Sequence, residues 1–275
     1  MNNIMMPQKW RLIDESNMQN RSPLESFAMD DTLCHLVGQQ LSSPTIRTWV
    51  HKESVVLGIQ DHRLPYIQQG MAYLIAQNYQ PIVRNSGGLA VVLDRGVLNI
   101  SLVLSEHEQT ISINTAFDLM VNFIKALFPE AANKIEAYEI IGSYCPGTYD
   151  LSIEGKKFAG ISQRRMKGGI AVQIYLCIEG NGSARAKLIK QFYEIGLQNA
   201  ETKFVYPNVT PHVMASLQEL LRTDITVAET NVRIQQLLEQ RRFDWEIAPL
   251  TASESDLYAY YLQRVFDRNK SMLGE

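Results

Sequence analysis

The chain has 275 residues, of which 45% are hydrophobic and 20% charged, and its formal net charge is −3. A chain of this size and composition can bury a sizeable core without a disulfide or a metal. The slightly acidic balance argues against the basic footprint of nucleic-acid binding, and no apolar run approaches the length of a membrane span. We therefore expect a cytoplasmic protein with neither nucleic acid nor membrane as a partner.

In the first half of the chain, hydrophobic periodicity predicts helices alternating with short strands. A helix is expected to begin after Ser22, whose hydroxyl can form a capping box with Glu25, and to stop at Gly38. Residues 90–93 and 97–104 are predicted to pair as a hairpin around Asp94-Arg95-Gly96. The other elements expected here are strands at 45–51, 54–59 and 81–84 and a helix at 64–78.

The second half predicts an amphipathic helix followed by a meander of strands. The helix covers 117–128 and ends at Pro129, and the long apolar run 170–178 is expected to be a central strand. The remaining expected elements are strands at 148–154 and 157–163, joined at Gly155-Lys156, and helices at 184–196, 212–222 and twice within 226–272. This pattern predicts an α+β fold with a mostly antiparallel mixed sheet flanked by helices, in a single domain over residues 1–275.

A glycine pair follows the strand expected at 81–84, in the run Arg84-Asn85-Ser86-Gly87-Gly88. Glycines directly after a strand allow positive φ and a close approach of a ligand to the backbone. On these residues alone the signal for a binding site is weak, because a glycine pair is more often an ordinary tight turn.

Two longer motifs carry a resemblance to a known family. RNSGGLAVVLDRGVLN at 84–99 resembles the glycine-rich signature of the lipoate ligase, octanoyltransferase and biotin ligase superfamily. GKKFAGISQRR at 155–165 resembles its lysine motif, and the segments at 27–34 and 55–61 resemble its first helix and an early strand. The resemblance implies a biotin/lipoate ligase-like catalytic core over 42–248 and a helical C-terminal extension over 226–275.

Within this superfamily the motifs look most like an amidotransferase of lipoate biosynthesis. Such an enzyme takes an octanoyl group from the lipoyl lysine of glycine cleavage H protein. It delivers the group to lipoyl domains of 2-oxoacid dehydrogenase acyltransferase subunits through a cysteine thioester, and it needs no cofactor. The alternatives are a transferase that uses octanoyl-acyl carrier protein, an ATP-dependent lipoate–protein ligase, and a catalytically inactive carrier-binding module. Lipoate ligases usually carry a histidine where this chain has Leu93, which weakens the ligase alternative.

Cys145 is the candidate nucleophile among three cysteines. It lies among turn-forming residues in Gly142-Ser143-Tyr144-Cys145-Pro146-Gly147, whereas Cys34 and Cys177 lie in a helical and an apolar strand pattern and are expected to be buried. An isolated loop cysteine is most often a bystander, and the resemblance is what makes Cys145 the expected acyl-thioester site. The five histidines are scattered and predict no metal site, and a cysteine–histidine pair is an alternative to the arrangement described next.

The resemblance nominates Lys157 as the partner of the thiol. A nearby ammonium lowers the pKa of a thiol, whose ordinary value is about 8.5, and can hold the acyl carbonyl as an oxyanion forms. Neighbouring Lys156 is expected to point to solvent. A regular hairpin would separate Cys145 from Lys157, so the loop must fold back over the sheet. The resemblance also assigns substrate binding to Arg84, Ser86, Gly87 and Gly88, with Gly160 and Ser162 in the facing wall.

A local basic cluster consists of Arg164, Arg165 and Lys167. It is either a solvated face or a docking patch for partner proteins, and the sequence leaves both open.

Overall fold

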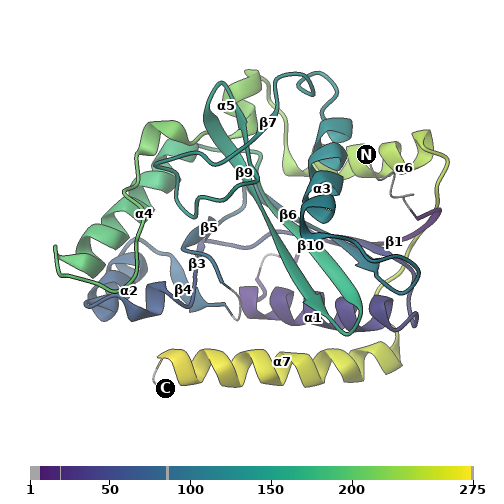
Figure 1. Ribbon diagram of the computed structural model, residues 1–275, viewed down its shortest axis with the longest axis horizontal. Coiled ribbons are helices and arrows are strands. Elements are labelled where there is room, and N and C mark those ends of the chain that lie inside the picture. Colours follow the sequence, from purple (N-terminus) through teal and green to yellow (C-terminus); the bar gives the residue numbers. More distant parts are fainter. Residues whose placement is uncertain (1–6, 19, 85–86, 274–275) are drawn as a thin grey trace.

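A computed structural model describes residues 7–18, 20–84 and 87–273. Two β-sheets lie side by side, with helices on their outer faces (Figure 1). The helices are α1 (Pro23–Gly38), α2 (Ile67–Ala76), α3 (Ile113–Leu127), α4 (Gly182–Leu197), α5 (Leu217–Leu221), α6 (Val227–Gln240) and α7 (Ala252–Leu273). None of the helices in the described part of the chain is long and apolar enough to cross a membrane.

The larger sheet has eight strands in the order β11-β1-β2-β6-β10-β9-β8-β7. β1 runs parallel to both of its neighbours, and every other pair is antiparallel, which confirms the predicted mostly antiparallel mixed sheet. The strands are β1 (Lys9–Glu15), β2 (Thr45–Trp49), β6 (Val97–Ser105), β7 (Glu136–Ala137), β8 (Asp150–Ile153), β9 (Lys156–Met166), β10 (Gly169–Cys177) and β11 (Asp244–Ile247).

The smaller sheet consists of β3 (Ser54–Leu57) between β4 (Gln80–Val83) and β5 (Val91–Leu93). The predicted hairpin of 90–93 with 97–104 is therefore wrong, because β5 pairs with β3 while β6 joins the larger sheet. The turn itself forms, with the Val97 amide donating to the Asp94 carbonyl at 3.0 Å. Core packing separates the two strands: Val92 is buried in the cluster around the smaller sheet and α4, whereas Leu98 belongs to the cluster around α3.

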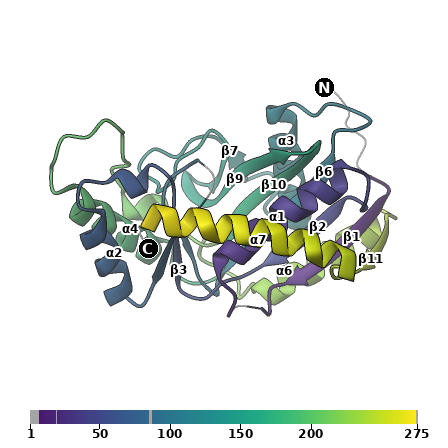
Figure 2. The ribbon, with the colours of Figure 1, turned by 90° about the horizontal axis from the view of Figure 1, so that it is seen from below.

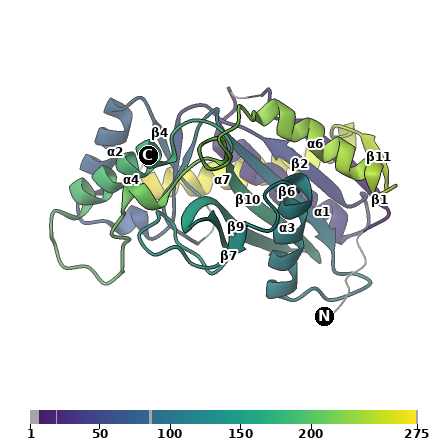
Figure 3. The ribbon, with the colours of Figure 1, turned by 90° about the horizontal axis from the view of Figure 1, so that it is seen from above.

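Helices cover both faces of the larger sheet. α1 and α7 lie on one face, with α7 outermost, and α3 and α6 lie on the other (Figures 2 and 3). Successive side chains of a strand point to opposite faces of the sheet, so the same strands contribute to the cores on both sides. Val103 and Ala171 face α1, whereas Leu102 and Val172 face α3. α2 and α4 pack together beside the smaller sheet.

Most predicted elements are present with shifted ends. α1 begins with the expected capping box of Ser22 and Glu25, β8 and β9 form the expected hairpin, and β10 is a buried central strand. The helix expected at 212–222 is instead a 3-10 turn at Pro211–Val213 and the short helix α5. The tail contains the two expected helices, but β1 and β11, which pair with each other, were not predicted.

Candidate active site

Two loops, one from each sheet, meet at the sulfur of Cys145. The Leu89 amide, in the glycine motif after β4, donates a hydrogen bond to Sγ at 3.3 Å. Arg84 Nη2 lies 3.7 Å from the same sulfur and also donates to the Leu89 carbonyl at 2.8 Å. A thiolate at this position would thus face one backbone N–H and one guanidinium, while Cys145 stays half-exposed and reachable.

The backbone of Cys145 is left-handed, with φ at +46°. This conformation is uncommon for a residue with a Cβ and persists only where surrounding contacts enforce it. The Nζ atom of Lys157 supplies those contacts, because it donates to the carbonyls of Cys145 at 2.8 Å and Tyr144 at 3.1 Å. The loop therefore does fold back over the β8–β9 hairpin, as the expected pairing of Cys145 and Lys157 requires.

Lys157 is buried on β9, and its exposed neighbour Lys156 points to solvent as expected. The contacts of Lys157 differ from a simple cysteine–lysine pair. Its described hydrogen bonds go to oxygens of the loop and to Asp150, and the hydrogen bonds to the sulfur come from Leu89 and Arg84.

Asp150 is a site residue that the sequence analysis missed. It lies buried on β8, with Oδ1 2.8 Å from Lys157 Nζ, while Oδ2 accepts from the Ile140 amide at 3.2 Å. Burial raises the pKa of Asp150, and the ammonium of Lys157 opposes that rise. The strand alternates polar and apolar residues, so its two sides differ in polarity, but both sides of β8 are buried.

The glycine motif allows the close approach of these groups. Gly88 has a φ of +94°, and a Cβ there would lie 2.2 Å from Arg84 Nη2 and 3.4 Å from Cys145 Sγ. Gly58 faces the same loop, since a Cβ on it would lie 1.8 Å from the Gly88 carbonyl oxygen. Gly87 is exposed with open space around it, and Ser86 lies outside the described residues.

The two positions assigned to the facing wall have different surroundings. Gly160 lies beside the buried pair, with its missing Cβ position 3.5 Å from Lys157 Cε and 3.7 Å from Asp150 Oδ1. Ser162 is exposed and donates to Gln173 Oε1 at 3.2 Å. Of these two residues, only Gly160 adjoins the Asp150–Lys157 pair.

A buried network of hydrogen bonds stabilises the glycine motif. Tyr193 on α4 donates to Asp61 Oδ1 at 2.8 Å and accepts from the Ala90 amide at 3.1 Å. The other oxygen of Asp61 accepts from the Gly58 amide at 2.7 Å. Burial raises the pKa of Asp61 to about 6, against the lowering effect of these hydrogen bonds. Because Ala90 follows Leu89, this network fixes the segment whose amide meets the sulfur.

The basic cluster lies at the other end of β9. Arg164 pairs with Asp31 at 2.6 Å and Arg165 with Glu106 at 2.9 Å, while Lys167 is exposed in the turn that follows. Arg164 lies seven positions after Lys157 on the strand, which is about 23 Å at the usual rise. Both guanidinium groups thus have intramolecular partners far from the thiol.

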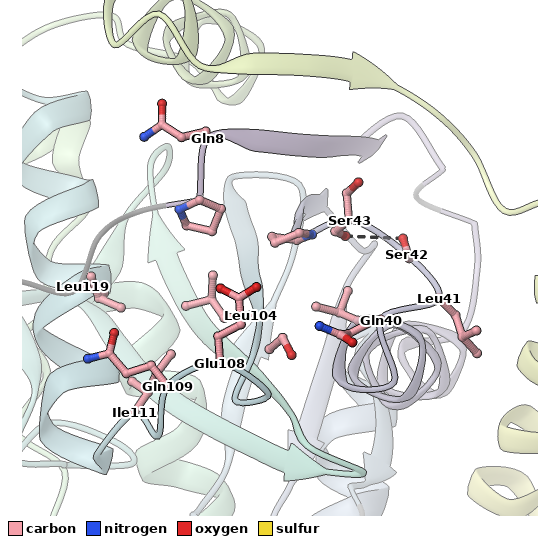
Figure 4. Close-up of a pocket in the computed structure, with 14 residues that line it drawn as sticks. Gln8, Gln40, Leu41, Ser42, Ser43, Leu104, Glu108, Gln109, Ile111 and Leu119 are labelled. Carbon is pink, nitrogen blue, oxygen red and sulfur yellow. Dashed lines mark hydrogen bonds between the residues drawn. The ribbon is translucent and has the colours of Figure 1, made fainter.

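One surface cleft lies away from the thiol. It measures about 690 Å³ and lies between the end of α1, the start of β1 and the loop after β6 (Figure 4). Its lining includes Gln8, Gln40, Leu104, Glu108 and Ile111 but no cysteine, lysine or histidine among the described residues. This cleft therefore offers no thiol that could carry an acyl group. Cys34 and Cys177 are buried, as expected.

Residues 22–239 match the family model described as the lipoyl protein ligase A/B catalytic domain. The chain belongs to this family. The resemblance noted in the glycine and lysine motifs is thereby confirmed.

Relatives in this family share the full length of the chain. It is 63% identical to octanoyl-[GcvH]:protein N-octanoyltransferase of Lysinibacillus sphaericus, over 99% of both chains. It is 47% identical to lipoyl-[GcvH]:protein N-lipoyltransferase of Listeria monocytogenes, over 99% of this chain and 98% of that one.

Solved structures share the fold at low identity. Lipoate-protein ligase A bound with ATP has a TM-score of 0.68 at 18% identity, over 94% of this chain and 95% of that chain. A bipartite lipoate protein ligase from Thermoplasma acidophilum has a TM-score of 0.62 at 17% identity, over 94% and 93% of the two chains. These likenesses confirm the predicted lipoate ligase-like α+β fold.

Proposed function

We propose that the chain is a protein N-octanoyltransferase of lipoate biosynthesis. It takes an octanoyl group from glycine cleavage H protein and delivers it to lipoyl domains of 2-oxoacid dehydrogenase acyltransferase subunits. The observation that carries the proposal is the half-exposed thiol of Cys145, which the Leu89 amide and Arg84 approach at 3.3 and 3.7 Å. The full-length relatives named for transfer from GcvH support this donor over acyl carrier protein.

The reaction proceeds in two balanced steps. The Cys145 thiolate attacks the carbonyl carbon of octanoyl-lysine on the donor, the C–N bond breaks, and the lysine leaves as an amine after taking a proton. The amine of the acceptor lysine then attacks the thioester, the C–S bond breaks, and one proton is released as the thiolate returns. One amide is exchanged for another, so no nucleotide is needed to drive the transfer.

The residues around the sulfur have different roles in the reaction. Arg84 and the Leu89 amide favour the thiolate through the hydrogen bonds that they donate to it. Lys157 supports it with a second positive charge and holds the acyl carbonyl, exchanging one of its loop contacts for the substrate oxygen. Gly87 leaves room for the acyl chain beside the backbone, and Gly88 lets Arg84 and the thiol come close to the loop.

Intact-protein mass spectrometry tests the proposal. The chain is incubated with octanoylated glycine cleavage H protein and no nucleotide, and we expect one octanoyl adduct, mapped by digestion to Cys145. Adding an acceptor lipoyl domain should remove the adduct and acylate the domain. Lipoylated H protein, run in parallel, measures which of the two acyl groups the site prefers.

Cysteine variants supply the matched controls. Cys145→Ser should form no thioester and lose transfer, whereas Cys34→Ala and Cys177→Ala should keep it, because both thiols are buried away from the site. Acylation that needs ATP and free octanoate would instead indicate a ligase. A faster reaction with octanoyl-acyl carrier protein would change the donor but leave the role of Cys145 intact.

A further inference from the structure

A buried ion pair lies inside the loop that carries Cys145. Lys157 Nζ and Asp150 Oδ1 are 2.8 Å apart, and each side chain is only 2% exposed. An ammonium has three N–H donors, and here four oxygens lie within reach of it. Besides Asp150 these are the carbonyls of Tyr144 and Cys145 and the hydroxyl of Ser143, the last at 3.3 Å. The pair is thus the internal support of the loop.

Asp150 also holds both ends of the loop. Its Oδ2 accepts from the Ile140 amide at 3.2 Å, where the loop begins. Its own amide donates to the Gly147 carbonyl at 3.1 Å, where the loop ends. Through Lys157 it also reaches the middle of the loop, where Cys145 adopts its left-handed conformation. Asp150 therefore fixes the loop at three points: its carboxylate acts at the beginning and, through Lys157, in the middle, and its backbone amide acts at the end.

We propose that Asp150 is a positioning residue for acyl transfer, acting through Lys157 and the loop that presents the thiol. This inference rests on the function proposed above. When the acyl carbonyl of the donor enters, Lys157 can give up a contact with the Tyr144 or Cys145 carbonyl and donate to the substrate instead. The Asp150 contact remains during this exchange, so the ammonium stays where the oxyanion forms.

Asp150→Asn tests the role with little change in size. Lys157 and the Ile140 amide meet different oxygens of the carboxylate, and in the carboxamide one of these positions becomes an NH2 donor, so one of the two contacts is lost. We expect the single-turnover rate of thioester formation to fall about 100-fold, as for other displacements of catalytic groups, with KM for octanoylated H protein nearly unchanged. The matched control is Ser152→Ala, because Ser152 is buried on the same strand and its Oγ has no hydrogen-bond partner among the described residues. Its rate should equal that of the wild type.

A double-mutant cycle with Lys157→Met separates positioning from plain structural support. If Asp150 acts through Lys157, adding Asp150→Asn to Lys157→Met should cause little further loss of rate. This comparison also serves if Asp150→Asn alone does not fold, since the double variant leaves no lone buried charge.

Two results would overturn the inference: a wild-type single-turnover rate in Asp150→Asn, or losses that multiply in the double variant. Failure of the proposed function looks different, because the wild type itself would then form no acyl adduct.

Discussion

Arg84 is the residue whose charge most directly meets the thiol, with Nη2 3.7 Å from Sγ. We expect Arg84→Met to slow the alkylation of Cys145 by iodoacetamide near neutral pH about ten-fold, because the thiolate loses a charged hydrogen-bond donor. Arg84→Lys should retain part of the rate, since it keeps the charge without the guanidinium geometry. Alkylation is followed by mass spectrometry on protein confirmed to be folded.

Lys156→Met is the surface control for that experiment and should alkylate at the wild-type rate, because Lys156 is exposed beyond the site. The alkylation rate of the double variant Lys157→Met/Asp150→Asn shows whether Arg84 or Lys157 stabilises the thiolate. An unchanged rate in Arg84→Met, together with slow alkylation of the double variant, would assign the stabilising charge to Lys157 alone.

Asp61 should give the protein a measurable pH dependence of stability. Its pKa is raised from 3.8 to about 6 in the folded state, so the folded protein binds the proton more tightly than the unfolded chain. The stability from this group is therefore complete below about pH 4 and is lost as the pH rises through about 6, a change of about 3 kcal/mol.

Comparison with Asp61→Asn isolates this contribution, because the other titrating groups are common to both proteins. The measured quantity is the free energy of urea unfolding of the wild type minus that of Asp61→Asn. We expect this difference to fall by about 3 kcal/mol between about pH 4 and pH 7. A difference that is constant with pH would show that Asp61 titrates as an ordinary carboxyl.

Some residues of the site could be predicted from the sequence and others could not. Cys145 and Lys157 stand in recognisable motifs, and the glycine pair marks a close backbone approach that Gly88 makes. Asp150 could not be identified, because a carboxylate on an alternating strand normally faces solvent. The role of the Leu89 amide could not be predicted either, because a backbone N–H has no signature in the sequence.

At the scale of elements, the C-terminal helix is held to the first strand by a buried ion pair. Arg11 on β1 donates to both oxygens of Glu254 on α7, at 2.7 and 3.0 Å, and to the Ala248 carbonyl at 2.8 Å. We expect Arg11→Met to lower the free energy of unfolding by about 3 kcal/mol or more, because it leaves the Glu254 carboxylate buried and unpaired. Urea titration followed by circular dichroism measures the effect.

An exposed ion pair on the same strand β1 provides the control. Lys9 on β1 pairs with Glu246 on β11, and their side chains are 54% and 59% exposed. Lys9→Met should therefore cost less than about 1 kcal/mol. Arg11→Met/Glu254→Leu should recover most of the loss, since neither charge then remains buried. If Lys9→Met and Arg11→Met lower the free energy of unfolding equally, the buried ion pair does not hold α7 to β1.

This ion pair also explains why β1 was not predicted. β1 has the sequence KWRLIDE, whose charged residues interrupt the pattern of a buried strand, yet Arg11 and Glu15 are both buried with partners distant in the chain. The false hairpin at Asp94 has the same origin. Local turn chemistry predicted the turn correctly, but the partners of β5 and β6 depend on packing between distant segments.

At the scale of the whole molecule, the site is shared between two sheets. The larger sheet supplies Asp150 and Lys157 from β8 and β9, and the loop after β4 of the smaller sheet supplies Arg84 and Leu89. The distance between the Leu89 amide and the sulfur therefore depends on how the sheets pack. A buried contact between the hydroxyls of Tyr144 and Tyr175 ties the thiol loop to β10 near that junction.

The exchange of one lysine amide for another predicts that transfer runs in both directions. Bonds of the same type are broken and formed, so the equilibrium constant should lie near one and the thioester should be reachable from either carrier. Starting from an octanoylated lipoyl domain and unmodified H protein, we expect octanoylated H protein to accumulate without nucleotide, with added ATP making no difference. Cys145→Ser should block both directions to the same extent, because the forward and reverse reactions pass through one intermediate. The two carriers are separated by mass after a fixed incubation. Transfer in one direction only, or a requirement for ATP, would show that the chain couples acylation to another source of free energy, as an ATP-dependent ligase of the same fold would.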